Sequence, residues 1–186
     1  MRLATWNVNS LKARLDRVLA WTERHEPDVL CLQETKLTDA QAPLMDFRAL
    51  GYDLVHHGPG RWNGVAIASR IGIADVVAGL PVRDDWTDDG GRFLAATCGP
   101  IRVASIYVPN GGKDFAAKMH FLQELGNYVA AAHRDRADQP PPHVRDGVGH
   151  DAVDLLRHRP VPAPEPGFDV HEERPRVARC AVPLRG

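Results

Sequence analysis

The stretch that decides the fold reads Pro27-Asp28-Val29-Leu30-Cys31-Leu32-Gln33-Glu34-Thr35-Lys36. A turn at Pro27 and Asp28 is followed by a run of apolar residues that ends at Glu34. An apolar run of this length, bounded by turn residues, is typical of a strand buried on both faces. The sequence therefore predicts a buried strand whose last residue is a carboxylate.

The residues before this strand complete a strand–helix–strand unit. Residues 2–9 read as a strand, and Ser10 is a plausible N-cap for an amphipathic helix over residues 11–25. The helix is indicated by residues at helical spacing: Leu11, Leu15, Val18, Leu19 and Thr22. A crossover of this kind is right-handed and makes its two strands parallel. Their carboxyl ends then meet at one edge of the sheet.

The elements downstream alternate between short strands and helices. Asp39 is expected to cap a helix over residues 40–50 that Gly51 ends. A long helix is expected from residue 115 to 133. The predicted strands are residues 52–57, 63–70, 73–77, 93–98 and 101–107, the last two forming a hairpin.

Composition places the chain among soluble globular proteins. It has 186 residues, of which 44% are hydrophobic and 25% charged, with a formal net charge of −1. Any nucleic-acid contact must therefore come from a local basic face. The three cysteines are widely spaced and odd in number, which argues against a disulfide framework or zinc site and fits a reducing compartment. We see no signal peptide or membrane span, and we expect a cytoplasmic protein with no membrane contact.

The composition changes after His133. Nine of the 15 prolines lie beyond residue 137, and the same region contains no lysine. Proline removes backbone donors and fixes φ, so this region is a poor former of ladders and helices. We expect one folded unit over residues 1–133 and an irregular tail over residues 134–186.

Polar side chains at the predicted sheet edge are candidates for chemistry. Asn7 and Glu34 stand near the ends of the two parallel strands. A carboxylate after an apolar run is costly unless it is paired or bound to a cation, and a hard oxygen ligand suits magnesium. Two alternatives stay open: Glu34 pairs with a cation such as Lys36, and Asn7 is only a turn former.

Tyr107 ends another predicted strand and is followed by a glycine-rich loop. Asn110 in that loop could hydrogen-bond a phosphate or a base, although an ordinary turn is the alternative. Basic side chains near these edges, with Trp62 beside one of them, could hold a DNA backbone. Each basic residue alone could equally be a solvated surface charge. They are Lys12, Arg14, Arg61, Arg92, Lys113 and Lys118.

Together these segments resemble the exonuclease III and AP endonuclease family of DNase I-like phosphodiesterases. The matching stretches are residues 4–11, 27–36, 51–52, 63–67 and 106–111. The resemblance covers residues 1 to about 133. It implies a four-layer α/β sandwich that cleaves phosphodiester bonds with Mg²⁺ or Mn²⁺. It also implies duplex DNA as partner, with 3′ ends and abasic sites as substrates. We see no sign of an obligate protein partner in the sequence.

Site residues follow from the same resemblance. Asn7 and Glu34 match the metal-site positions, and Tyr107 matches the active-site tyrosine. The positions that match a DNA-binding groove are Asn9, Asn63, Arg92, Asn110 and Lys118.

Two motifs of that family are missing from the sequence. Neither Gly-Asp-x-Asn, whose Asp orients the attacking water, nor Ser-Asp-His occurs, and Gly149-His150-Asp151 is a poor substitute. We therefore expect an incomplete sandwich with uncovered sheet faces and open edges. A shifted reading frame would explain the change in composition. The alternatives to an active nuclease are an inactive fragment of one, or a phosphodiesterase of the same fold with another substrate.

Overall fold

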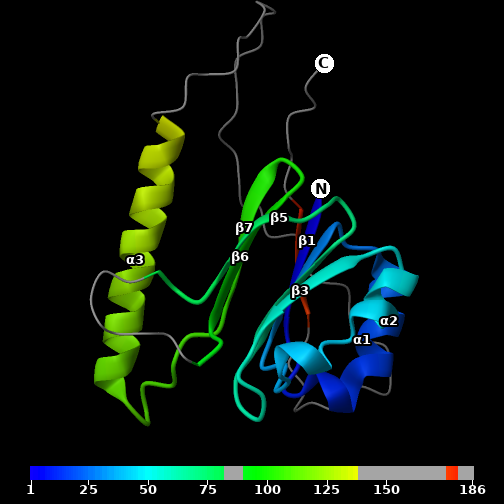
Figure 1. The fold of residues 1–186 in the computed structure, drawn as a ribbon, viewed down its shortest axis with the longest axis horizontal. Coiled ribbons are helices and arrows are strands. Elements are labelled where there is room, and N and C mark those ends of the chain that lie inside the picture. The colour runs from blue at the N-terminus through cyan, green and yellow to red at the C-terminus, as the bar shows by residue number, and fades with distance from the viewer. Residues whose placement is uncertain (82–89, 138–174, 180–186) are drawn as a thin grey trace, which may run out of the picture.

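The computed structural model describes residues 1–81, 90–137 and 175–179. Its strands and helices pack in four layers (Figure 1). In chain order the elements are β1 (Arg2–Asn7), α1 (Leu11–His25), β2 (Val29–Gln33), the 3₁₀ helix η1 (Asp39–Gln41), α2 (Leu44–Ala49), β3 (Asp53–His57), β4 (Val65–Ser69), β5 (Ala74–Ala78), β6 (Phe93–Cys98), β7 (Ile101–Ile106), α3 (Phe115–Ala137) and β8 (Arg176–Arg179).

Two sheets form the middle layers. The larger sheet has the strand order β3-β4-β2-β1-β8, and the smaller one has the order β5-β6-β7. β1 and β2 are parallel, with Asn7 opposite Gln33, as the strand–helix–strand pattern predicts. All other pairs are antiparallel, including the predicted β6–β7 hairpin. The α/β sandwich implied by the resemblance is therefore confirmed.

Three apolar clusters hold the layers together. Between α1, α2 and the larger sheet lie Trp6, Val18, Leu30, Leu32 and Phe47. Between the two sheets lie Val29, Cys31, Ile67, Leu94 and Ala96. Between the smaller sheet and α3 lie Phe93, Ala95 and Phe121. β2 contributes alternate side chains to the first two clusters, and burial on both faces explains its continuous apolar run.

The start of α1 differs from the prediction in one respect. Ser10 precedes the helix as expected, but its side chain makes no capping hydrogen bond. Instead, the backbone N–H groups of Ser10 and Leu11 donate to the carbonyl oxygens of Glu34 and Thr35, at 2.7 and 2.9 Å. The segment that follows β1 is thereby tied to the segment that follows β2.

The predicted helix over residues 40–50 is wrong in its first half. Thr38, not Asp39, is the N-cap, and it forms a capping box with Gln41 at the 3₁₀ helix η1. The α-helix α2 begins only after Pro43, because proline lacks the N–H that would continue the earlier turn. Gly51 follows this helix with φ 81°. This is the left-handed conformation expected of a helix stop.

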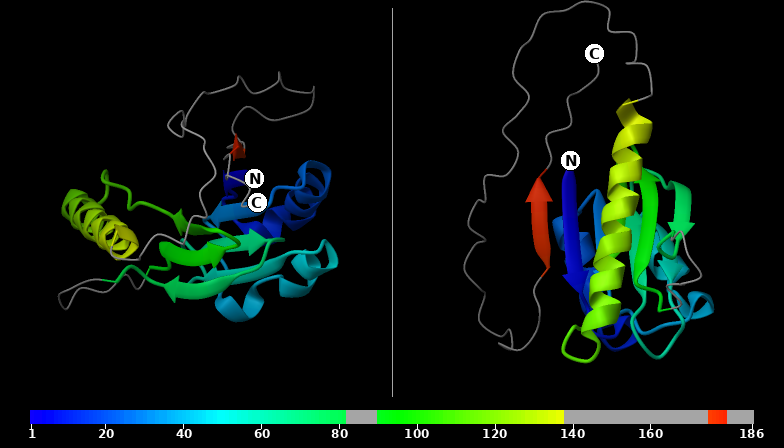
Figure 2. Two further views of the ribbon diagram at one scale, coloured as in Figure 1. Left: turned by 90° about the horizontal axis from the view of Figure 1, so that it is seen from above. Right: turned by 90° about the vertical axis from the view of Figure 1, so that its left-hand side faces the viewer.

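One expectation about the incomplete sandwich, that its tail is irregular, also needs correction. Residues Arg176–Arg179 of the predicted irregular tail form β8, which pairs antiparallel with β1 (Figure 2). An edge strand such as β1 offers unpaired backbone groups, which explains this pairing. α3 packs on the outer side of the smaller sheet through Phe121. Apolar side chains of α3 remain exposed, among them Met119 at 47% and Leu122 at 37%, so uncovered apolar surface is present as expected. The rest of the tail, including Gly149-His150-Asp151, lies outside the described residues.

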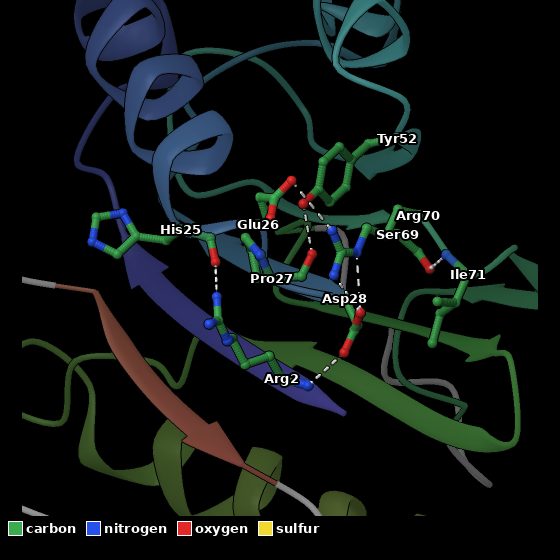
Figure 3. Close-up of polar contacts among 9 residues, drawn as sticks. All are labelled: Arg2, His25, Glu26, Pro27, Asp28, Tyr52, Ser69, Arg70 and Ile71. Carbon is green, nitrogen blue, oxygen red and sulfur yellow. Dashed lines mark hydrogen bonds and ion pairs between the residues drawn. The ribbon is translucent and has the colours of Figure 1, made fainter.

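A cluster of polar residues lies at the edge of the larger sheet where β1 and β2 begin (Figure 3). Asp28 accepts hydrogen bonds from the backbone N–H of Arg2 at 2.6 Å and from the Arg70 guanidinium at 2.9 and 3.0 Å. The Tyr52 hydroxyl donates to the Pro27 carbonyl at 2.6 Å. These contacts join the starts of β1 and β2 to the end of β4.

None of the helices in the described ranges is long and apolar enough to cross a membrane.

Candidate active site

Asn7 and Glu34 meet at the edge where β1 and β2 end. The Asn7 Nδ2 group donates to Glu34 Oε1 at 2.8 Å, although the two residues are 27 positions apart. The side chain of Glu34 is 21% exposed. The parallel strand ends thus bring together the amide and the carboxylate that the sequence predicts.

Lys36 provides a counter-charge to the same carboxylate. Its Nζ lies 3.3 Å from Glu34 Oε2 and also hydrogen-bonds Asn9 Oδ1. The Arg14 guanidinium donates to the Asn9 carbonyl oxygen. The ion pair that we considered as an alternative is therefore present, and it shares Glu34 with Asn7.

Tyr107 reaches the same carboxylate from the second sheet. Partial burial by itself raises the pKa of Glu34. Hydrogen bonds from Asn7, Tyr107 and Lys36, with the charge of Lys36, outweigh this and leave that pKa below its usual range. Glu34 is therefore ionised at neutral pH. The Arg92 guanidinium carbon lies 5.1 Å from the centre of the Tyr107 ring, in cation–π geometry.

The backbone around these side chains is unusually strained. Asn9, Glu34, Lys36 and Asn63 all have positive φ, at 42°, 52°, 55° and 54°. Such conformations cost free energy in residues other than glycine and tend to cluster at functional sites. Their concentration at one sheet edge agrees with the position of the candidate site.

Gly64 lets two of these loops approach closely. The backbone N–H groups of Thr35 and Lys36 donate to the carbonyl oxygens of Gly64 and Asn63, at 3.1 and 2.8 Å. Gly64 has φ 87°, and a Cβ atom there would lie 2.2 Å from Thr35 Oγ1. Only glycine fits at this position. Asn63 is thereby held beside the segment that carries Glu34.

The other predicted DNA-binding residues lie on the surrounding surface. The Asn110 side chain accepts a hydrogen bond from the Gly112 N–H at 2.9 Å and so stabilises its own turn. Lys118 lies against that turn at Gly111. Lys12 is exposed at the start of α1. The Arg61 guanidinium stacks 5.8 Å from the Trp62 ring centre, and Trp62 is 66% exposed. Their described contacts do not involve Glu34.

The structure adds a chain of polar contacts at Thr35, the residue after Glu34, that sequence reasoning missed. Thr35 Oγ1 lies 2.8 Å from His56 Nε2, and His56 Nδ1 lies 2.7 Å from Asp39 Oδ1. Burial lowers the pKa of His56 despite the opposing effect of Asp39, so His56 is neutral at pH 7. The signal in the sequence was Thr35, a polar residue directly after Glu34 at the end of the apolar run, and the structure buries it completely.

The donor set at this edge suits a hard divalent cation. The described residues contain no group of three or more His, Cys, Asp or Glu side chains that could hold a metal ion. A cation here would rest on the Glu34 carboxylate, water and the second lone pair of the Asn7 amide oxygen, which accepts a hydrogen bond from the Asn9 N–H at 3.1 Å. Magnesium retains several waters and needs only one or two carboxylates, so these residues fit it.

Known proteins share both the sequence pattern and the fold. The pattern of the endonuclease/exonuclease/phosphatase family matches residues 4–168, and so extends past residue 133. This family generally depends on divalent metals. Exodeoxyribonuclease III of Haemophilus influenzae is 31% identical over 142 residues, which are 72% of this chain and 52% of that protein.

Two solved structures are also similar. An AP endonuclease from Archaeoglobus fulgidus has TM-score 0.65 and 37% identity, covering 69% of this chain and 51% of its own. A 3′-5′ exonuclease from Neisseria meningitidis has TM-score 0.66 and 38% identity, covering 74% and 53%. The chain thus spans about half the length of these relatives. Because the family pattern covers most of the chain and its fold agrees with solved relatives, this chain belongs to the endonuclease/exonuclease/phosphatase family.

Proposed function

We propose that this chain carries part of the active site of an exonuclease III-type DNA phosphodiesterase acting in DNA repair. The observation that carries the proposal is the meeting of Asn7, Glu34 and Tyr107 at one sheet edge. Relatives named exodeoxyribonuclease III and AP endonuclease support this choice over other phosphodiesterases of the fold.

Each of the three residues has a role in this proposal. The ionised Glu34 carboxylate and the Asn7 amide oxygen would hold Mg²⁺, for which Mn²⁺ could substitute. A bound cation would supply electrostatic stabilisation of the charge that develops on the phosphate in the transition state. When substrate binds, Tyr107 would turn its one hydroxyl proton from Glu34 to a phosphate oxygen. Lys36 holds the Glu34 carboxylate in place at its second oxygen.

The surrounding polar and basic side chains would bind duplex DNA. Phosphate contacts from such residues position the duplex, and an exposed aromatic ring can stack on a base or sugar. A 3′ phosphatase from Neisseria, 34% identical to this chain, is known with a product DNA hairpin. We place the protein in the cytoplasm, without an obligate protein partner. The proposed DNA-binding residues are Asn9, Lys12, Arg14, Arg61, Trp62, Asn63, Arg92, Asn110 and Lys118.

A second candidate is a fragment that binds metal and DNA without turnover. The 186-residue sequence lacks Gly-Asp-x-Asn, and loss of the base that orients water costs on the order of 10²–10⁴ in rate. We propose residues 1–133 as the family domain, followed by a tail over residues 134–186 that a shifted reading frame would explain. Sequencing the locus tests the frameshift, which is refuted if no frame encodes Gly-Asp-x-Asn downstream.

Two measurements test these candidates: metal binding tests the site that both share, and cleavage separates an active nuclease from an inactive fragment. The first is metal binding, followed by the paramagnetic broadening that Mn²⁺ causes in the ¹⁹F signal of 3-fluorotyrosine at Tyr107. We expect broadening in the wild type and its loss in Glu34→Gln. The matched control Glu23→Gln, which changes an exposed glutamate on α1, should behave like the wild type. Absence of broadening in the wild type would refute the metal site.

The second measurement is magnesium-dependent cleavage of a duplex containing an abasic site. We expect turnover at least about 100-fold below that of a full-length relative, since the general base is missing. Residual cleavage should fall further in Glu34→Gln and Tyr107→Phe but not in Glu23→Gln. Turnover equal to that of a full-length relative would refute the fragment candidate.

A further inference from the structure

A polar network lies beside the candidate site; its members Gln33 and Ser105 are buried between the two sheets, whereas Thr5 is exposed. The Gln33 Nε2 group donates to Thr5 Oγ1 at 3.1 Å and to Ser105 Oγ at 3.0 Å. The Thr5 hydroxyl donates to Gln33 Oε1 at 3.3 Å, and the Ser105 hydroxyl donates to the Leu32 carbonyl at 2.9 Å. Every polar atom of the Gln33 and Ser105 side chains is therefore hydrogen-bonded.

The three members stand on the three strands that carry the site residues. On β1, Thr5 precedes Asn7 by two positions, and just after β7, Tyr107 follows Ser105 by two. Residues two apart in a strand point to the same face and lie about 6.6 Å apart. On β2, Gln33 directly precedes Glu34. Each of Asn7, Glu34 and Tyr107 is thus only one or two residues along the chain from a member of the network.

The network also joins the two sheets, because Gln33 on the larger sheet bonds Ser105 on the smaller one. The neighbouring contacts between the sheets are apolar, such as those of Cys31 and Ala96. Apolar contacts are non-directional, whereas hydrogen bonds constrain distance and angle. Gln33 is 8% exposed and Ser105 is fully buried, so neither can exchange its partner for water freely.

We propose that Gln33, Ser105 and Thr5 are positioning residues that set the distance between Tyr107 on the second sheet and Glu34 on the first. This inference rests on the proposed function, because it assigns the network to the metal and phosphate site. A glutamine is suited to the task, since its amide bonds β1 and β7 at the same time. Loss of either hydroxyl partner should leave the fold intact while Tyr107 moves relative to Glu34.

The test uses the full chain labelled with 3-fluorotyrosine. The protein has three tyrosines, Tyr52, Tyr107 and Tyr128, so three ¹⁹F signals are expected, and Tyr107→Phe assigns one of them. Tyr52 bonds the Pro27 carbonyl at the opposite sheet edge and serves as an internal reference.

The variants are Ser105→Ala, which removes a hydroxyl, and Ser105→Thr, which keeps it. The matched control is Ser69→Ala, because Ser69 is also a buried strand serine that bonds a backbone carbonyl, that of Gly72 at 2.9 Å. Gln33→Met removes the amide of Gln33 and keeps a side chain of similar volume. It serves as a second test if Ser105→Ala does not fold.

We expect Ser105→Ala and Gln33→Met to shift the Tyr107 signal without moving that of Tyr52. The Mn²⁺ concentration that half-broadens Tyr107 should rise about tenfold, as is common when residues supporting metal ligands are lost. Ser105→Thr should restore the wild-type shift. Ser69→Ala should lower thermal stability without altering the Tyr107 signal.

An unchanged Tyr107 signal in folded Ser105→Ala and Gln33→Met would overturn the inference, even if both variants melt earlier. Failure of the proposed function looks different: Mn²⁺ would then leave wild-type Tyr107 unbroadened. The metal-free ¹⁹F shifts would still report whether the network positions Tyr107.

Discussion

Replacing Asp28 with asparagine tests the polar cluster at the edge opposite the candidate site (Figure 3). Asp28 Oδ2 accepts from the Arg2 backbone N–H, and Oδ1 accepts from two nitrogens of Arg70. An asparagine amide has one acceptor oxygen and one NH₂ group. In Asp28→Asn, either the Arg2 backbone N–H or the Arg70 guanidinium must therefore face the NH₂ group of the asparagine, which is itself a donor. The negative charge is also lost.

The size of the effect follows from the contacts of Asp28. Hydrogen bonds to a charged group contribute about 1.5–3 kcal/mol when buried. Asp28 is 20% exposed and Arg70 is 37% exposed, so solvent weakens the Arg70 pair more than the Arg2 contact. We expect the free energy of unfolding to fall by about 2 kcal/mol. For a domain of this size that corresponds to a decrease in Tm of about 4–8 °C.

The effect should depend on pH with a defined sign. Partial burial by itself raises the pKa of Asp28, but the Arg2 N–H and the Arg70 guanidinium outweigh it and leave that pKa below its usual value of 3.8. A lowered pKa in the folded state means stability that is present above the unfolded pKa. It is lost as pH falls through the folded value. The difference in free energy of unfolding between wild type and Asp28→Asn should therefore be largest at pH 7 and decrease below about pH 4.

Chemical denaturation of both proteins at pH 7 and pH 3 measures these differences. Asp16→Asn is the matched control, because Asp16 is an exposed aspartate on α1. It should change stability by less than about 0.5 kcal/mol. The electrostatic reasoning is refuted if Asp28→Asn is as stable as Asp16→Asn at pH 7, or if its deficit is larger at pH 3 than at pH 7.

Other predictions concern local packing. Gly64→Ala should destabilise the protein and shift the backbone amide NMR signals around Thr35, because the new Cβ would overlap Thr35 Oγ1; unchanged signals would contradict this. Tyr52→Phe should cost about 1 kcal/mol in urea unfolding by removing the hydrogen bond to Pro27, and no loss would mean that water replaces it. Phe121→Ala should cost about 3–5 kcal/mol by thermal unfolding, since the ring is fully buried between α3 and the smaller sheet. A loss below about 1 kcal/mol would show that the site collapses around the cavity.

The local elements could largely be predicted from the sequence. Hydrophobic spacing placed the unit β1–α1–β2, and turn residues placed the β6–β7 hairpin, because both signals act between residues close along the chain. The same unit placed Asn7 and Glu34 at one edge, since a right-handed crossover leaves the strands no other arrangement. The error at the start of η1 arose from tertiary contacts, because the Asp39 carboxylate accepts from the Gly58 N–H at 2.9 Å and lies 2.7 Å from His56 Nδ1.

Only the tertiary structure brought Tyr107 to Glu34. The two residues belong to different sheets and are 73 positions apart, and no periodicity along the chain encodes the distance between sheets. That distance depends on how the side chains of both inner faces pack and on the hydrogen bonds of Gln33 and Ser105. The sequence by itself determined which residues stand at strand ends, whereas packing between the layers decided which of those ends meet.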